Sequence, residues 1–304
     1  MNSSVLSSEQ LATRSGAFNA IAAYCMWGIA PLYFKLLIDL GAGEILMHRI
    51  IWSSAFIFLL VLVTKKWTVL VQLCQQPKII AKLALSAMVL AVNWLLFIWA
   101  VNNNHLLDAS LGYFINPLFN VALGMLFFSE RLRRNQVIAV GLAFFGVLVQ
   151  LFTVGSLPLI SLALASSFAI YGVLRKKLHV DSLVGLLIES LIMLPVAIIY
   201  WFYFVNSTTA NLALNSSTLN FTLVMAGVVT TAPLLCFTAA AKRLTLSSLG
   251  FFQYIGPSIM FCLATFYFNE PLYMAEFVTF IFIWTALALY SFDAYHNIKL
   301  KRIK

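Results

Sequence analysis

The sequence predicts an all-α integral membrane protein of ten transmembrane helices, arranged as two inverted five-helix repeats with both termini in the cytoplasm. Three observations lead to this fold class. Apolar residues make up 62% of the 304 residues and charged residues 10%, against about 45–50% and 25% in soluble domains. Lysine and arginine fall on alternate connections between apolar segments, and one segment of the first half recurs in the second.

A transmembrane helix needs about 20 mostly apolar residues, and ten such segments can be traced along the chain. We expect helices at residues 17–38, 45–64, 80–100, 106–128, 136–153, 156–174, 183–204, 220–240, 246–268 and 273–292. Residues 1–16 lack the basic start and the cleavage site of a removed signal peptide, so we expect them to form a cytoplasmic N-terminal segment. Residues 294–304 are expected to form a basic cytoplasmic tail.

The basic residues test this count. With the N-terminus in the cytoplasm, 17 of the 19 lysines and arginines fall on cytoplasmic segments, and none falls on an external connection, including the polar stretch 205–218. Cytoplasmic connections of membrane proteins carry such an excess. The net charge of +9 therefore reflects topology and contact with the lipid bilayer, and it does not indicate nucleic acid binding.

One segment occurs twice, as LGYFINPLFNVALGMLFFSE at 111–130 and LGFFQYIGPSIMFCLATFYFNE at 249–270. Both copies begin with Leu-Gly-aromatic-Phe, carry one proline and end on a glutamate thirteen residues after it, with two additional residues between glycine and proline in the second copy. A recurrence at about 140 residues indicates two copies of one unit.

We therefore expect a first five-helix repeat at 17–153 and a second at 154–293. Five is an odd number, so the two copies must have opposite orientations in the membrane. Inverted repeats are typical of secondary transporters, whose substrate sites lie near the middle of the membrane between the repeats.

Several stretches resemble a known family. They are WGIAPLYFK (27–35), MHRIIWS (47–53), SLGYFINPL (110–118), YGVLRKK (171–177) and FFQYIGP (251–257). Together with the repeated proline and glutamate segment, they resemble the EamA family of the drug/metabolite transporter superfamily, in particular its RarD-type permeases. The resemblance covers nearly the whole chain. It implies a multi-pass permease of the bacterial inner membrane that exports a small metabolite or drug.

Pro117 and Pro257 lie near the middle of predicted helices. A proline there leaves a backbone carbonyl without its donor and kinks the helix. At membrane depth such a carbonyl must face protein or a water-filled cavity, so both kinks are expected to border a central cavity, with a packing role as the alternative. In the cavity interpretation Asn116, Gln253 and Tyr254 are candidate contacts to substrate.

Lys35 and Arg49 are the two basic residues outside the cytoplasmic segments. A cation in hydrocarbon costs from a few to over about ten kcal/mol, so it usually faces protein or water. One alternative is that both reach the membrane surface, where Asp39 or Glu44 neutralises them. The other is that both face the cavity beside His48, which suits an anionic or zwitterionic aromatic substrate. The full candidate substrate-binding set is Trp27, Lys35, His48, Arg49, Asn93, Tyr113, Asn116, Gln253 and Tyr254.

Glu189 is the most deeply placed acid, about two turns into its helix from the cytoplasmic side. In hydrocarbon it must be protonated or paired. Pairing with Lys35, Arg49 or Arg175 and a role as the proton carrier of coupled transport are both open. Two other acids, Glu130 and Glu270, are expected to cap or brace helix ends.

The sequence contains no signature of enzymatic or metal chemistry. The four cysteines lack paired or metal-ligand spacing, and no phosphate loop, HExxH motif or nucleophile elbow is present. We therefore expect no cofactor, no metal and no enzyme activity, but a secondary transporter that works by alternating access, in the export direction and coupled to protons. The alternatives are a passive facilitator and an intramembrane enzyme acting on a lipid-linked substrate, with Glu189 and His48 as acid and base.

Overall fold

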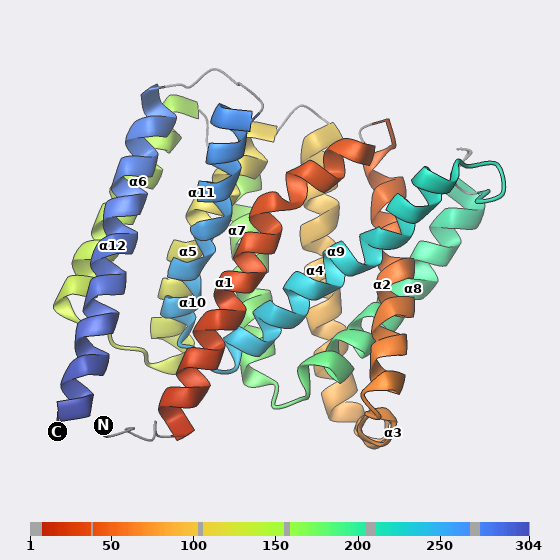
Figure 1. The fold of residues 1–304 in the computed structure, drawn as a ribbon, viewed down its shortest axis with the longest axis horizontal. Helices are drawn as coiled ribbons and strands as arrows, with labels where there is room; N and C mark the ends of the chain where they lie inside the picture. Colours follow the sequence, from red (N-terminus) through yellow and green to blue (C-terminus); the bar gives the residue numbers. More distant parts are fainter. Residues whose placement is uncertain are drawn as a thin grey trace, which may run out of the picture.

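The computed structural model describes residues 8–37, 39–102, 106–154, 159–204, 209, 211–267 and 274–303. All regular secondary structure in this part of the chain is helical (Figure 1). The helices are α1 (Ser8–Phe34), α2 (Ala42–Val63), α3 (Trp67–Cys74), α4 (Pro77–Asn102), α5 (Leu106–Phe128), α6 (Arg134–Val154), α7 (Leu159–Lys177), α8 (Ser182–Phe204), α9 (Ser217–Ala241), α10 (Leu246–Gln253), α11 (Ile255–Cys262) and α12 (Met274–Ile303). Two short turns of other helix types, η1 (Lys35–Leu37) and η3 (Leu263–Tyr267), follow α1 and α11.

Ten segments of the described chain are long and apolar enough to cross a membrane, which confirms the expected number of spans. The ends differ from the expectation. The first helix already begins at Ser8 and the last continues to Ile303, so most of the basic tail extends a helix instead of forming a separate segment. No proline interrupts the chain at either place, so the helical backbone continues past the apolar core.

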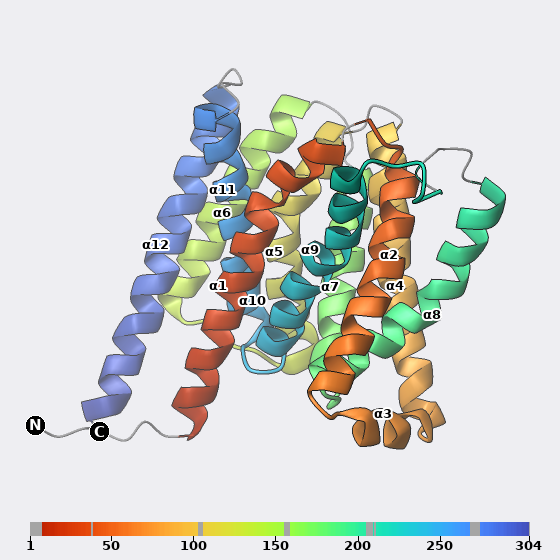
Figure 2. The ribbon, with the colours of Figure 1, turned by 45° about the vertical axis from the view of Figure 1, so that its right-hand side comes forward.

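Helix α3 was not expected. It lies in the connection between the second and third spans, where Leu70 and Leu73 are buried against the bundle while Trp67 stays exposed. An eight-residue helix is too short to cross a membrane. Figure 2 shows α3 lying across the lower end of the bundle, at the level where α1 begins and α12 ends.

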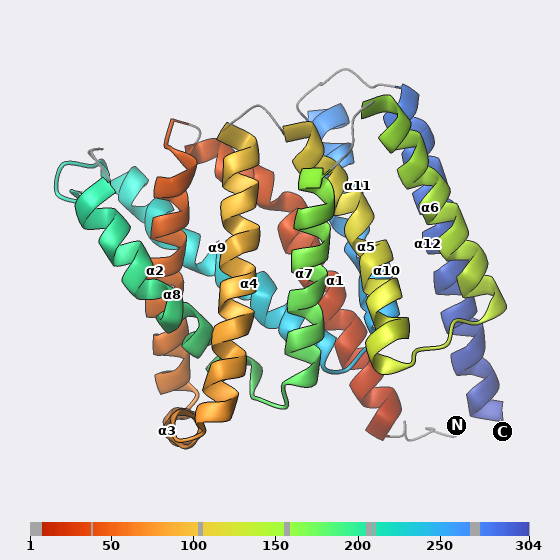
Figure 3. The same cartoon turned by 180° about the vertical axis from the view of Figure 1, so that it is seen from behind.

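The two halves of the chain pack mainly against each other. Helix α2 contacts α8 and α9, α1 contacts α9 and α11, and α5 contacts α7 and α10. Helix α4 packs on α7 and α8, and α6 pairs with α12 at one side of the molecule (Figure 3). The bundle is therefore one interleaved body, and neither half has a core of its own.

The helices of the two halves share a register. Helices α8, α9, α10 and α12 begin 140 positions after α2, α4, α5 and α6, respectively. The two additional residues seen in the repeated segment therefore do not shift the helix start or the proline. They mean only that the Leu-Gly-aromatic-Phe pattern lies two positions earlier along its helix in the second half.

The two proline-containing spans have different backbones. Helix α5 continues through Pro117 without interruption. In the second half α10 ends at Gln253, a single turn residue follows, and α11 begins two residues before Pro257. Proline has no N–H to bond the carbonyl four positions earlier, and that carbonyl belongs to Gln253. A π-helical turn, η3, then closes the span.

Candidate functional site

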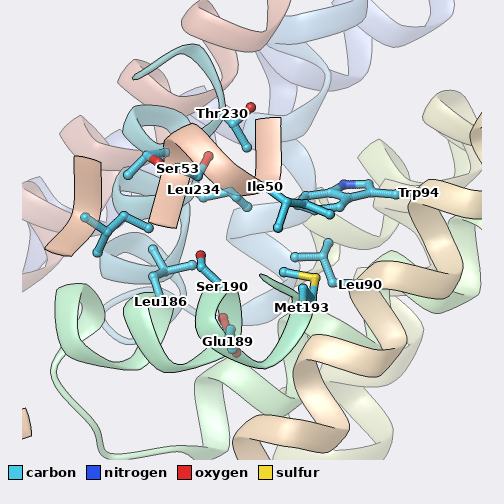
Figure 4. A pocket seen from close by; sticks show the side chains of 12 residues that line it. Ile50, Ser53, Leu90, Trp94, Leu186, Glu189, Ser190, Met193, Thr230 and Leu234 are labelled. Carbon is cyan, nitrogen blue, oxygen red and sulfur yellow. The ribbon is translucent and has the colours of Figure 1, made fainter. Parts of the chain in front are cut away.

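A small cavity lies between α2, α4, α8 and α9 (Figure 4). The centre of a water molecule can move through about 10 Å³ of it, which is room for about one water. Thr231 on its wall is 1% exposed, and its hydroxyl has no hydrogen-bond partner among the described residues. The cavity is therefore polar at one point but too small for an organic solute unless the helices separate.

The walls of the cavity combine equivalent positions of the two halves. Eight of the twelve lining residues form four pairs whose members are 140 positions apart. These pairs are Ile50 with Ser190, Ser53 with Met193, Leu90 with Thr230, and Trp94 with Leu234. The same spacing separates the starts of the four helices that form the cavity. The cavity thus lies where the two halves face each other.

Glu189 lines this cavity and is 1% exposed. Its Oε1 accepts a hydrogen bond of 3.1 Å from Nη1 of Arg175, whose side chain is also 1% exposed, and its Oε2 accepts one of 3.4 Å from the Tyr171 hydroxyl. The buried hydroxyl of Ser86 on α4 faces the same carboxylate without a hydrogen bond of ordinary geometry. Of the pairings that the sequence leaves open, the structure contains the one with Arg175.

The local sequence explains how Arg175 reaches Glu189. Only four residues separate α7 from α8, so the last turn of α7 lies beside the first turns of α8. A Cβ at Gly185 would stand 2.7 Å from Nη1 of Arg175, so the absence of a side chain there makes room for the guanidinium. Nη2 of Arg175 also donates to the Ser182 carbonyl at 3.4 Å.

Asp181 begins α8. Its Oδ1 accepts from the backbone N–H groups of Leu183 and Val184 at 3.0 and 3.2 Å, and its Oδ2 accepts from Nζ of Lys66 at 2.6 Å. Partial burial raises the pKa of Asp181, but these hydrogen bonds and the Lys66 charge outweigh burial and hold it below its usual value. The carboxylate caps the helix and ties it to the end of α2.

Arg49 on α2 lies behind the cavity wall, in contact with two of its residues. Its Nε donates to Thr230 Oγ1 at 2.9 Å, and its guanidinium carbon lies 5.5 Å from the Phe34 ring centre and 5.2 Å from that of Trp94. The hydroxyl groups of Tyr33 and Tyr113 are near enough to interact with its charge. Thr230 and Trp94 are wall residues of the cavity, and Figure 4 shows Thr230 and Glu189 at opposite ends of it.

Three other predicted residues lie away from the cavity wall. His48 is fully buried beside Trp201, with ring centres 5.5 Å apart, and neither of its nitrogens has a partner among the described residues. Lys35 is exposed in η1. Trp27 packs in an aromatic cluster with Phe168 and Phe237, with ring centres 5.9 Å apart in both cases.

Asn93 and Tyr113 lie on α4 and α5. The Asn93 amide donates to the Leu164 carbonyl and the Ser167 hydroxyl, both at 2.9 Å, so it joins α4 to α7. Tyr113 is 42% exposed, and its ring meets the edge of Phe97 at 6.2 Å. Of these two residues, Tyr113 is the one whose side chain interacts with Arg49.

Asn116 and Gln253 belong to a buried polar chain between α5 and α10. Asn116 donates to the Ala165 carbonyl at 2.7 Å, and Asn120 donates to both Asn116 Oδ1 and Gln253 Oε1 at 3.0 Å. Tyr254, beside this chain, donates to a backbone carbonyl of α5 at 3.2 Å. Sequence reasoning missed Asn120, although its position one helical turn after Asn116 could have identified it.

The two proline segments meet at this crossing. A Cβ at Gly250 would stand 2.8 Å from the carbonyl oxygen of Pro117, so α10 approaches α5 closely because Gly250 has no side chain. Neither Pro117 nor Pro257 is among the residues that line the cavity.

Glu130 caps a helix, which confirms the expectation for this residue. Ser129, directly after α5, has a φ of 52°, a left-handed conformation that commonly ends helices, and the Glu130 N–H returns to the Gly124 carbonyl at 3.2 Å. The carboxylate then accepts from the N–H groups of Leu246 at 2.6 Å and Ser247 at 2.9 Å, at the start of α10. Glu270 lies outside the described residues.

Comparisons with known proteins agree with this architecture. The model of the EamA-like transporter family matches residues 14–152. "Protein RarD" of Escherichia coli (strain K12) is 56% identical over 94% of this chain and 96% of its own length, and an uncharacterized transporter of Vibrio cholerae is 51% identical over 94% of each. A crystal structure with 16% sequence identity superimposes with a TM-score of 0.72 over 93% of this chain and 98% of its own. The chain therefore belongs to the EamA-like transporter family.

Proposed function

We propose that the protein is a secondary transporter of the bacterial inner membrane, which moves a small organic solute by alternating access between two inverted repeats at 17–153 and 154–293, with both termini in the cytoplasm. The observation that carries the proposal is the cavity whose walls are built from residue pairs 140 positions apart. A site made of equivalent positions is what two rocking repeats share at their interface. In Figure 1 α2 descends while its counterpart α8 rises, which supports the inversion.

Close contacts between the halves supply the pivots. A Cβ at Gly227 on α9 would stand 2.5 Å from the backbone of Trp52 on α2, and one at Gly28 would stand 2.7 Å from Ile259 on α11. Helices that approach this closely at small residues can tilt about the contact without repacking large side chains. Because the cavity holds about one water in this conformation, the solute enters when tilting opens one end of it.

Glu189 couples the movement to protons. Its carboxylate faces Arg175 and Tyr171 from α7 and Ser86 from α4, and Lys242 stands near Arg175 at the end of α9. Burial and then the charge of Arg175 lower the pKa of Lys242 to about 8. Protonation of Glu189 removes the partner of Arg175 and so loosens the contact between α7 and α8. Solute movement is thereby linked to proton movement.

The test is transport by the purified protein in liposomes with an imposed pH gradient. A radiolabelled solute is first chosen by thermal shift from amino acids, aromatic acids, nucleosides and antibiotics. Glu189→Gln should abolish accumulation against the solute gradient but retain exchange of labelled for unlabelled solute. Asp293→Asn is the matched control, because Asp293 pairs with Arg133 outside the cavity, and it should accumulate solute normally.

Two outcomes would point to the other functions. Flux that follows the solute gradient alone, unchanged in Glu189→Gln, indicates a passive facilitator. Chemical conversion of the solute in detergent, where no gradient exists, indicates an enzyme.

A further inference from the structure

We infer that Arg49 is the anion-binding group of the transport site, and that the transported solute carries a carboxylate held by Arg49 and an apolar or aromatic body held against Trp94. This inference rests on the proposed function and specifies its substrate class. It follows from the groups that surround the Arg49 guanidinium and from the lack of a carboxylate beside it among the described residues.

Arg49 lies well inside the bundle. It is seven residues after the start of α2 at Ala42, or about 10 Å along the helix axis, and its side chain is partly buried. A cation at this depth is expensive unless it is paired or faces water. Its position against two wall residues of the cavity, Thr230 and Trp94, therefore requires an explanation.

Within the described residues, no carboxylate interacts with this guanidinium. The groups that do so are the hydroxyl groups of Thr230, Tyr33 and Tyr113 and the rings of Phe34 and Trp94. Arg175, the other deeply placed arginine, has Glu189 at 3.1 Å. The two arginines thus border the same region, but among the described residues only Arg175 has an acid beside it.

The geometry leaves one side of Arg49 available. Nε is already bonded to Thr230, and the rings of Phe34 and Trp94 lie within stacking distance of the guanidinium. Among the described residues, no hydrogen bond occupies its two terminal nitrogens, which are the pair that binds a carboxylate through two parallel hydrogen bonds. A single guanidinium neutralises one negative charge, which favours a monocarboxylate over a dianionic phosphate.

The neighbouring wall fits the rest of such a solute. Trp94 contacts the guanidinium and also lines the cavity, so a group bound to Arg49 has an aromatic surface next to it. The hydroxyl of Thr231, which is buried and has no hydrogen-bond partner in the described part of the chain, is available to a second polar atom. The remaining wall near it is mostly apolar, including Ile50 and Leu234.

The first test is ligand binding in detergent, with benzoate as the probe and benzamide and benzylamine as neutral and cationic analogues. Benzoate should raise the melting temperature of the wild type by several degrees, at concentrations where its analogues do nothing. Arg49→Gln should weaken benzoate binding by roughly 10–100-fold, because charge-assisted hydrogen bonds are lost. Arg49→Lys should weaken it less. Arg243→Gln is the control, since Arg243 is exposed and donates to its own helix.

The second test needs no ligand. Thr230→Glu places a carboxylate beside Arg49, where it acts as an internal substitute for the solute. It should raise the melting temperature in the wild-type background, remove the benzoate effect, and lower the melting temperature in the Arg49→Gln background. The same effect of Thr230→Glu in both backgrounds, or equal stabilisation by benzoate and benzamide, overturns the inference.

These outcomes are separable from the proposed function, because binding in detergent needs no gradient. If liposomes carrying Arg49→Gln accumulate solute as the wild type does, the protein is a transporter but Arg49 is not its anion site. If benzoate binds through Arg49 but no solute crosses the membrane, the anion site stands and the transport proposal fails.

Discussion

The turn between α1 and α2 and the turn between α7 and α8 occupy equivalent positions, yet opposite chemistry surrounds them. In the second half Arg175 and Glu189 form a buried ion pair. The positions 140 residues earlier hold Lys35 and Arg49, both cations. Arg175 and Glu189 therefore join their two helices, whereas Lys35 and Arg49 cannot pair with each other in the same way, because both are cations.

The difference extends along the two helices. Asp181 caps α8 with its side chain, whereas its counterpart Gly41 begins α2 with no side-chain hydrogen bond. Gly185 makes room for Arg175, whereas its counterpart is Ile45. Three equivalent positions, at the cap and one and two turns into the helix, thus all strengthen the second half. This comparison indicates that side chains of the protein itself make the α7–α8 turn rigid. The rigidity of the α1–α2 turn instead depends on what binds there.

Breaking the ion pair is expected to have the largest effect. Glu189→Ala leaves Arg175 buried without its acid, which should reduce the free energy of unfolding by about 3–5 kcal/mol. Arg49→Ala should cost less than about 1 kcal/mol, because none of the described acids loses a partner. Denaturant unfolding in detergent measures both. The double variant Arg175→Met/Glu189→Leu is the control and should recover most of the loss. Equal costs for the two single variants would contradict the comparison.

Filling the space beside Arg175 comes next. Gly185→Ala places a Cβ 2.7 Å from the guanidinium, which should destabilise the protein by about 1–3 kcal/mol. Gly141→Ala is the matched control, because a Cβ at Gly141 meets nothing within 4 Å, and it should be neutral or slightly stabilising. In the Arg175→Met background the penalty of Gly185→Ala should shrink. If it does not, the helix backbone and not Arg175 requires the glycine.

Exchanging the caps should have the smallest effect. Asp181→Ala should cost about 1 kcal/mol. Gly41→Asp should gain roughly 0.5 kcal/mol, since Gly41 has an extended backbone with φ of −61° and open space for a side chain. Melting temperatures of the two variants measure these effects. A lower melting temperature in Gly41→Asp would show that α2 does not accept a side-chain cap.

The pH dependence of Asp181 follows from its lowered pKa. The unfolded chain binds this proton more readily than the folded one, so the contribution of Asp181 is fully present above its unfolded pKa of about 3.9. It is lost as the pH falls through the lower folded value. Asp181→Asn should therefore flatten the stability profile below about pH 4 and leave it parallel to the wild type above pH 5.

The sequence predicts the spans well, because length and apolarity alone decide what crosses a membrane. It does not predict which residues line the cavity. Helices that are apolar on all sides give no periodic signal for rotation, so Ser190, Met193 and Thr230 could not be told from lipid-facing neighbours. Glu189 and Arg49 were found because a charge at depth is conspicuous. The break of the ninth span at Tyr254 could be predicted only in part. Pro257 indicates a break there, but the equivalent Pro117 leaves its own helix continuous.

The cap that Glu130 places on α10 also bears on how the chain is assembled. Glu130 precedes Leu246 by 116 residues, so during synthesis its carboxylate emerges long before the amides it will satisfy. Helix α10, in turn, begins without an acceptor of its own for the N–H groups of Leu246 and Ser247. The second half therefore depends on the first for a complete helix end, and insertion of the ninth span finishes only against an α5 that is already in place.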